Sequence, residues 1–382
     1  MSDNRIDTQH GTPLGVAIYG CGIIATNHAD AIARLPELHI VALVDVLEPA
    51  AIALADHIEE RGAPRPPTYS SIEDALEAGG VDLVVVCLPS GLHVAAAESA
   101  VAAGCHVVIE KPLDVSLPRA RRIAELARDA AEHGLVVSVI SQHRIDPASV
   151  VVQRAAASGG LGRLTSGVAS IAWWRSQEYY DQAAWRGTWE LDGGGAAMNQ
   201  GVHTIDLLVW MLGRPIEVSA RMATLAHERI EVEDTLVATV TFESGALGVI
   251  HATTAAFPDV GARLQIHGSR GSAVIEQDQL RYFHSADGEG EGDQAASLVD
   301  QEDLAGNEKP ADSFAIGHAR QYRDIVDAIR SGRPPAVTVD DALLTLAVIR
   351  GLYLSASRGS SVAISDVLSG SFDADESTGR TS

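Results

Sequence analysis

A glycine-rich turn near the start of the chain restricts the fold more than any other feature of the sequence. The apolar run of residues 14–19 leads directly into Gly20-Cys21-Gly22-Ile23-Ile24-Ala25, which matches the pattern G-x-G-x-x-A. In this pattern the first glycine makes a tight turn, the second lets a diphosphate approach the backbone, and the small third residue keeps helix and strand close. The following helix presents free N–H groups to the phosphates. A dinucleotide site is therefore predicted at Gly20, Gly22, Ile23 and Ile24, against the alternative of an ordinary glycine turn.

The segments after this turn alternate between strand-like and helix-like patterns. Apolar runs at residues 39–44, 83–88, 107–109 and 136–140 are separated by alanine-rich stretches such as 93–103 and 118–133. Continuous apolar runs are typical of strands buried on both faces of a parallel sheet. Such strands alternating with helices indicate an α/β, doubly wound fold. We therefore expect a Rossmann domain over residues 1–142.

The pattern changes after about residue 145, and a length of 382 residues itself suggests two domains. Two helical stretches (147–157 and 194–212) and six strand-like runs (165–174, 216–225, 234–242, 246–254, 263–267 and 272–276) predict a second α/β domain over residues 143–368. Short successive strands indicate a large, mainly antiparallel open sheet. Residues 285–313 are expected to form a surface loop. Helices near 316–330 and 339–357 and a disordered tail at 369–382 complete the chain.

Composition excludes several classes of protein. The chain has 51 acidic and 28 basic side chains and a net charge of −23. This charge argues against nucleic-acid binding, which needs clustered Lys and Arg. Cys21, Cys87 and Cys105 lack a disulfide framework and predict reduced thiols in the cytoplasm. Neither a signal peptide in residues 1–13 nor a membrane span is expected.

Polar residues at the ends of the apolar runs suggest the rest of the cofactor site. Asp45 follows the second run, where a carboxylate accepts the ribose hydroxyls of NAD and repels the 2′-phosphate of NADP, so we expect NAD. The alternative is a solvated aspartate at a strand end. Pro89 follows the third run, and His93 stands at a helix start, where it either caps the helix or contacts the nicotinamide ribose.

Two further motifs suggest catalytic groups. Lys111 lies between Glu110 and Pro112 directly after the fourth run, where its charge could polarise a substrate oxygen; the alternative is a lysine reaching solvent from a strand end. Three glycines at 193–195 precede Asn199 and His203, which are four residues apart and would share a helical face. A histidine is the usual proton carrier between alcohol and carbonyl, although a lone helical histidine is more often structural. Asp206 could hold its imidazole, and no metal site is expected.

Together these motifs resemble the Gfo/Idh/MocA oxidoreductases over residues 14–366. The glycine turn, the Glu-Lys-Pro triplet, the Gly-Gly-x-x-x-x-x-Gly-x-His-x-x-Asp segment and the late stretch from Gly317-His318 carry the resemblance. It implies NAD(H) or NADP(H), a sugar or cyclitol substrate, Lys111 as the functional lysine and His203 as the acid/base. Many members have Asp where this chain has Asn199. An amide cannot take a proton, so proton transfer would rest on His203, with Asn199 orienting a hydroxyl.

An aromatic and arginine-rich segment at residues 174–189 refines the resemblance. With Ser141-Gln142-His143-Arg144, it is similar to a subgroup that includes bacterial UDP-N-acetylglucosaminuronic acid 3-dehydrogenases. Aromatic faces stack on sugars, and arginines bind carboxylate or phosphate; the alternative is that these aromatics belong to a core or an interface. The expected substrate-binding residues are Lys111, His143, Arg175, Tyr179, Asn199 and His203. The expected cofactor-binding residues include Pro89, His93, Glu110, Lys111, Trp185 and Arg186.

The sequence thus predicts an NAD-dependent oxidoreductase that moves hydride to or from a secondary alcohol of a sugar, cyclitol or derivative, with sugar acids and nucleotide sugars among the candidate substrates. Two alternatives stay open. One is redox-neutral, NAD-dependent glycoside cleavage, and the other is an NAD-binding sensor without activity. Because an open sheet with an exposed apolar face needs covering, we also expect a homodimer or homotetramer.

Overall fold

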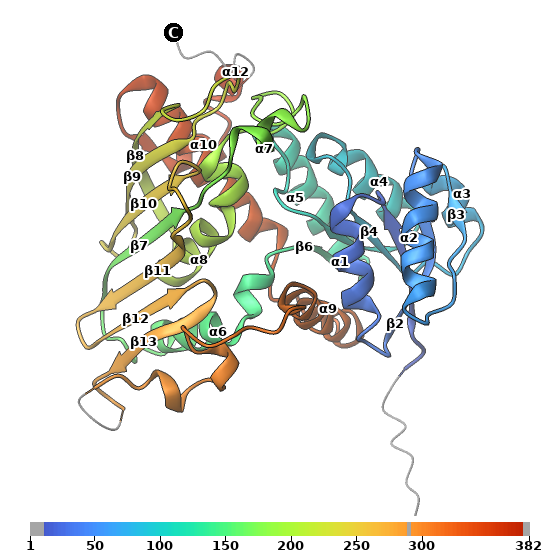
Figure 1. The fold of residues 1–382 in the computed structure, drawn as a ribbon, viewed down its shortest axis with the longest axis horizontal. Coiled ribbons are helices and arrows are strands. Elements are labelled where there is room, and N and C mark those ends of the chain that lie inside the picture. Colours follow the sequence, from blue (N-terminus) through green and yellow to red (C-terminus); the bar gives the residue numbers. More distant parts are fainter. Residues whose placement is uncertain (1–10, 289–291, 377–382) are drawn as a thin grey trace, which may run out of the picture. The chain divides into compact units, whose positions relative to one another are not determined.

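The chain forms two compact units in the computed structural model, which describes residues 11–288 and 292–376 (Figure 1). Of these described residues, the first unit comprises those up to 111, 125–140 and 312–338, and the second comprises the others. No helix in the described residues is long and apolar enough to cross a membrane.

The first unit is built on a six-stranded parallel sheet. Its strands run in the order β3-β2-β1-β4-β5-β6, with the bounds β1 Leu14–Tyr19, β2 Leu38–Val44, β3 Thr68–Tyr69, β4 Leu83–Val86, β5 His106–Ile109 and β6 Val137–Val139. The apolar runs form these strands because both faces of the sheet are covered; every residue of β4 is buried. The predicted Rossmann fold is confirmed. Chain order reverses between β1 and β4, and ligands of such sheets bind at the carboxyl ends of the strands there.

Helices and one short 3₁₀ turn connect these strands. They are α1 (Ile23–Ile32), α2 (Glu48–Glu60), α3 (Ile72–Glu77), η1 (Ser90–Leu92), α4 (His93–Ala102) and the part of α5 (Leu117–Glu132) from residue 125.

One late helix corrects the predicted domain boundaries. Helix α9 (Ser313–Ser331) was expected in the second domain, but it belongs to the first unit and lies beside α1 (Figure 1). Its Tyr322 and Ile325 share a buried core with Ala25 and Ile32 of α1. The sequence pattern identified the apolar face of this helix, but a periodic pattern does not say which core the face joins.

The second unit is built on an eight-stranded sheet in the order β13-β12-β11-β7-β10-β9-β8-β14. Its strands are β7 Leu164–Ala172, β8 Pro215–Ala223, β9 Thr235–Phe242, β10 Leu247–Thr253, β11 Gly261–Gly268, β12 Gly271–Glu276, β13 Gln279–Ser285 and β14 Val362–Ala363. Strands β7 and β10 are parallel and the other pairs are antiparallel. The predicted large, mainly antiparallel sheet is confirmed.

The two faces of this sheet differ. Helices α8 (Val202–Leu212) and α10 (Val339–Arg358) pack on one face, where a Cβ at Gly167 of β7 would come within 2.7 Å of Leu208. The other face exposes apolar side chains of β9 and β10, among them Val237, Leu247 and Val249. One face is therefore buried by helices, whereas the other is open in the single chain.

Short elements complete the second unit. They are η2 (Gln142–Ile145), α6 (Pro147–Ala157), α7 (Gln177–Asp181), η3 (Ala196–Gln200), α11 (Ile364–Leu368) and α12 (Asp373–Glu376). The predicted surface loop contains two 3₁₀ turns, η4 (Ala295–Ser297) and η5 (Gln301–Asp303). Within the predicted tail, Asp373 pairs with Arg121. The remaining tail residues 377–382 and the N-terminal residues 1–10 lie outside the described residues.

Candidate active site

The glycine turn has the geometry that a dinucleotide site requires. Gly20 has φ = 96°, and a Cβ there would lie 2.7 Å from the carbonyl oxygen of Cys87, so no side chain fits. A Cβ at Gly22 would meet nothing within 4 Å, so a ligand can approach the backbone there. Helix α1 starts at the next residue, Ile23, which is 87% exposed. The helix N-terminus is therefore open to a phosphate group.

Asp45 is fixed beside this turn. One carboxylate oxygen accepts from the Cys21 N–H at 2.8 Å, and the other accepts from the Leu47 N–H at 2.8 Å. Each oxygen retains a lone pair for a ribose hydroxyl. Val46 and Leu47 expose apolar side chains next to it. These residues fit the adenosine half of NAD, with Asp45 as the acceptor for the ribose.

Pro89 and His93 are the cofactor-binding residues predicted after β4, and His93 is buried. His93 is the first residue of α4 and is 1% exposed, and its Nε2–H donates to the carbonyl oxygen of Leu88 at 2.9 Å. Pro89 precedes the 3₁₀ turn η1, in which Leu92 is exposed. The structure thus gives His93 a buried contact within the protein, and its contact with the nicotinamide ribose stays a prediction.

Glu110 and Lys111 follow β5 at the same edge of the sheet as Gly20 and Asp45. Glu110 is 5% exposed. One of its carboxylate oxygens lies 2.9 Å from Nε2 of His28, and the other accepts from the Lys111 N–H at 3.0 Å. Burial would raise the pKa of Glu110, but the hydrogen bond from His28 and the proximity of His318 and Lys111 hold that pKa well below its usual range. Glu110 is therefore an ionised carboxylate bonded to protein groups, and its contact with the cofactor stays a prediction.

In the second unit, a glycine segment and Glu233 shape the turn that carries Asn199. The sequence predicts one continuous helix over residues 194–212. In the structure, residues 196–200 form a π-helical turn instead. The N–H groups of Gly195 and Ala197 both donate to the Glu233 carboxylate at 2.9 Å, and Tyr353 donates its hydroxyl at 3.0 Å. This external acceptor replaces the usual helical partners. Such π turns are frequent at functional sites.

Asn199 and His203 stand on this turn and on the first turn of α8. The Asn199 amide donates to Asp192 Oδ1 and to the Gly194 carbonyl, both at 2.8 Å, so its oxygen is the atom suited to accept from a hydroxyl. The His203 ring lies against the His143 ring, with centroids 4.9 Å apart and an interplanar angle of 79°. The structure thus places His143 beside His203.

Asp206 has a different partner from the one suggested by its spacing. Arg144, which is buried, makes two hydrogen bonds of 2.7 Å to the Asp206 carboxylate. Ser141 and Thr345 donate to the same carboxylate at 2.6 and 2.8 Å. Asp206 therefore compensates a buried guanidinium, which needs a counter-charge more than a neutral imidazole does.

His143 is held by two carboxylates. Its Nδ1 lies 2.8 Å from Asp146 and 3.2 Å from Asp278, and the latter also accepts from Lys309 at 3.1 Å. Burial opposes charge on His143, but Asp278 and Asp146 outweigh it and raise the pKa of the imidazole. Asp278 lies in the tight turn between β12 and β13 with φ = 67°. No local sequence pattern points to Glu233, Asp278 or Lys309 as site residues. The turn at Gln277-Asp278 is readable from the sequence, but its distant partner is not.

The predicted arginines gather around one tyrosine. The Arg186 guanidinium lies 4.4 Å from the ring centre of Tyr179, and that of Arg175 lies 5.5 Å from it. Arg186 also donates to the Tyr179 carbonyl at 2.9 Å and lies over the half-exposed Trp185 ring. Cation–π contacts of this kind hold guanidinium groups in place. The structure therefore brings Arg175, Tyr179, Trp185 and Arg186 together as one cluster.

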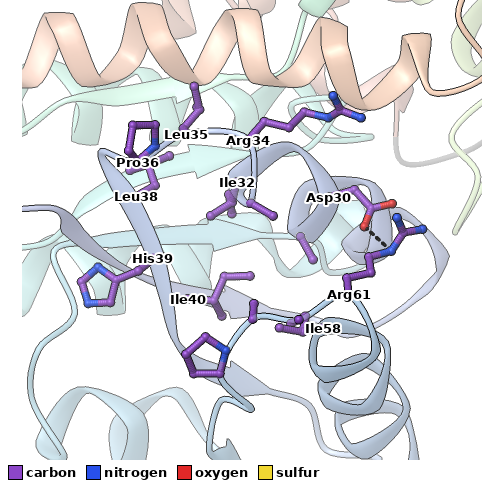
Figure 2. Close-up of a pocket in the computed structure, with 15 residues that line it drawn as sticks. Asp30, Ile32, Arg34, Leu35, Pro36, Leu38, His39, Ile40, Ile58 and Arg61 are labelled. Carbon is purple, nitrogen blue, oxygen red and sulfur yellow. Dashed lines mark ion pairs between the residues drawn. The ribbon is translucent and has the colours of Figure 1, made fainter.

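A separate cavity of about 580 Å³ lies elsewhere in the first unit (Figure 2). Its lining includes the last turn of α1 and the start of β2, with Leu35, Leu38 and Ile40. Asp30 and Arg61 form an ion pair of 3.0 Å beside it (Figure 2). The end of α1 is opposite to the end that meets the glycine turn, so this cavity is not the dinucleotide site.

Family profiles match both units. Residues 14–141 match an oxidoreductase family with an NAD-binding Rossmann fold, and residues 150–274 match the Gfo/Idh/MocA C-terminal domain. The chain belongs to the Gfo/Idh/MocA family. It is accordingly an NAD-binding oxidoreductase, as the sequence predicted.

Several relatives in this family are named as dehydrogenases. The WlbA dehydrogenase of Bordetella pertussis, solved with NADH and UDP-GlcNAcA, is similar with 30% identity and a TM-score of 0.78, over 92% of this chain and 98% of that chain. The chain is 25% identical to myo-inositol 2-dehydrogenase of Thermotoga maritima over 92% of this chain and 99% of that protein. It is 26% identical to scyllo-inositol 2-dehydrogenase (NADP⁺) IolW of Bacillus subtilis over 80% of this chain and 87% of that protein.

Proposed function

We propose that this family member transfers hydride between NAD and a secondary alcohol of a sugar, cyclitol or sugar derivative. Lys111 carries the proposal, because it stands at the same carboxyl-terminal edge of the parallel sheet as Gly20 and Asp45. A cation at that edge can stabilise negative charge that develops on a substrate oxygen beside the nicotinamide. Bound NAD supplies the hydride acceptor.

Three side chains divide the remaining chemistry. In the oxidation direction, His203 takes the proton of the substrate hydroxyl, and Lys111 stabilises the oxygen as that proton leaves. Asn199 accepts a hydrogen bond from a substrate hydroxyl through its amide oxygen, since its N–H groups donate to Asp192 and Gly194. An amide takes no proton, so His203 is the proton acceptor in this scheme.

The choice of cofactor and substrate class rests on charge. The Asp45 carboxylate favours NAD over NADP because it repels a 2′-phosphate. Arg175 and Arg186, held at Tyr179, suit a substrate with a carboxylate or phosphate group, such as a sugar acid or a nucleotide sugar. Similarity to the protein that was crystallised with UDP-GlcNAcA supports the same class.

The test compares wild type with His203→Ala on a panel of polyols, sugars, uronic acids and nucleotide sugars. We expect NADH to accumulate with at least one class, and His203→Ala to lower turnover by roughly 10²–10⁴-fold while NAD still binds. His133→Ala is the control, because His133 is an exposed histidine near the end of α5. Unchanged turnover in His203→Ala contradicts the assigned role. Product without NADH would indicate redox-neutral glycoside cleavage, and binding of NAD without any turnover would indicate a sensor.

Assembly and location complete the proposal. The open face of the second sheet, with Val237, Leu247 and Val249 exposed, supports a homodimer or homotetramer. The three cysteines are free thiols in the structure. Burial raises the pKa of Cys21 to about 12, so this thiol is unreactive. Thiols without disulfide partners fit a reducing compartment such as the cytoplasm.

A further inference from the structure

Four buried polar side chains meet at the end of β5 in the first unit. His28 comes from α1, Glu110 from the end of β5, and His318 and Tyr322 from α9. The three aromatic side chains are fully buried, and Glu110 is almost so. A buried carboxylate is costly unless it is hydrogen-bonded, so the partners of Glu110 determine where it can lie.

A chain of hydrogen bonds leads from Tyr322 through His28 to Glu110. His28 lies between Tyr322, whose hydroxyl is 2.6 Å from Nδ1, and Glu110, whose Oε1 is 2.9 Å from Nε2. Burial lowers the pKa of His28, which favours the neutral ring. In the neutral ring Nε2–H donates to the carboxylate, and Nδ1 accepts from the Tyr322 hydroxyl. The second oxygen of Glu110 accepts the backbone N–H of Lys111 at 3.0 Å.

His318 approaches the same carboxylate from α9. Its Nδ1–H donates to the Phe314 carbonyl at 3.0 Å, which directs Nε2 toward Glu110 at 3.7 Å. That Nε2 has no hydrogen-bond partner among the described residues. The rings of His28 and His318 meet edge to face, with centroids 4.9 Å apart. The carboxylate is thus enclosed by α1 on one side and by α9 on the other.

The cluster also has the composition of a metal site, because the three ligand atoms of His28, Glu110 and His318 lie within 4.8 Å of one another. Two ligands of a tetrahedral zinc ion would be about 3.3 Å apart. The separation of 2.9 Å between His28 Nε2 and Glu110 Oε1 is instead that of a hydrogen bond. The geometry therefore favours direct hydrogen bonding over metal ligation.

Building on the role proposed above for Lys111, we propose that His28, His318 and Tyr322 are positioning residues that act through Glu110 on Lys111. The Glu110 carboxylate bonds the backbone N–H of the next residue and so restricts the peptide from which the Lys111 side chain extends. His28 belongs to the helix that begins at the glycine turn. The Glu110 carboxylate therefore links the helix that begins at the glycine turn to the backbone of Lys111.

Because the chain contains few lysines, the effect on Lys111 can be measured directly. The sequence contains two lysines, Lys111 and Lys309. Protein labelled with ¹³C and ¹⁵N only at lysine gives two sets of side-chain NMR signals, and Lys309→Arg assigns them. The test variants are Tyr322→Phe, which removes the hydroxyl, and Glu110→Gln, which keeps the shape and removes the charge. The control is Ser138→Ala, which removes another buried hydroxyl of the first unit, bonded to the Val337 carbonyl at 2.8 Å.

We expect both test variants to shift the Lys111 signals and to leave those of Lys309 in place, whereas Ser138→Ala moves neither. Turnover should fall about tenfold with little change in the KM for the alcohol, and the deuterium isotope effect on kcat should rise. Unmoved Lys111 signals in both folded variants would overturn the proposal, as would stoichiometric metal in the purified wild type. If Lys111 responds but no alcohol is oxidised, the proposed function fails and the positioning role stands.

Discussion

Replacing Gly195 with alanine tests how the second unit builds the turn that carries Asn199. A Cβ at this position would lie 1.8 Å from the carbonyl oxygen of Glu233 and 2.9 Å from its carboxylate. Neither group can rotate away easily, because the carbonyl accepts from the Ala196 N–H at 3.1 Å and the carboxylate accepts from Gly195 and Ala197. The backbone itself must therefore move by about 1 Å or more.

The structure gives the size of the effect. Three hydrogen bonds to Glu233 are disturbed, and at about 1 kcal/mol each the loss of unfolding free energy is roughly 3 kcal/mol. For a unit of this size, that corresponds to a decrease in Tm of about 10 °C. Displacing Asn199 by about 1 Å should also lower kcat/KM for the alcohol on the order of 10²-fold.

The assay combines thermal unfolding with NADH formation, and it includes NAD affinity measured by calorimetry. Gly160→Ala is the matched control, because a Cβ there meets atoms only at 3.4 Å and beyond. NAD affinity should be unchanged in both variants, since the glycine turn is in the other unit. A Gly195→Ala protein with the Tm and turnover of wild type would refute the reasoning.

Three other predictions concern single carboxylates. Asp45→Ser should raise the preference for NADP over NAD by about tenfold in kcat/KM, because it removes the charge that repels a 2′-phosphate. Burial raises the pKa of Glu233 to about 7, so the folded protein holds this proton more tightly than the unfolded chain. The free energy of unfolding should therefore fall by up to about 3 kcal/mol as the pH rises from 4.5 to 7. Urea titrations over this pH range should show the decrease for wild type and a smaller one for Glu233→Gln. Asp206→Ala removes the bidentate partner of the buried Arg144 and leaves only its 3.2 Å ion pair with Asp341. Denaturant unfolding should therefore show a loss of about 3 kcal/mol, whereas a loss below 1 kcal/mol would contradict the pairing.

The parts of the fold that depend on short-range sequence patterns were predictable. Strand periods, the glycine turn and the residues that end β2 and β5 are readable within a few positions, because buried parallel strands need continuous apolar runs. Asp45 and Lys111 could be assigned to the same edge of the sheet for the same reason.

The parts that depend on distant contacts were not predictable. Helix α9 has a clear apolar face, yet only the packing shows that it joins the core of α1. Asp206 was matched to His203 by a spacing of three residues, but the structure pairs it with Arg144, which is 62 positions away. Glu233 and Asp278 have no local signal that names their partners, because hydrogen bonds across such distances leave no periodicity in the sequence.

The open face of the second sheet has a consequence for dilute solutions. The register pairs Val249 with Thr239 of β9 and with Val168 of β7, so β-branched side chains form rows across neighbouring strands. If copies of the chain associate through this face, mass action adds their binding energy to the stability of each fold. The Tm should then rise with protein concentration, and Val249→Lys should abolish that rise while leaving the dilute protein folded.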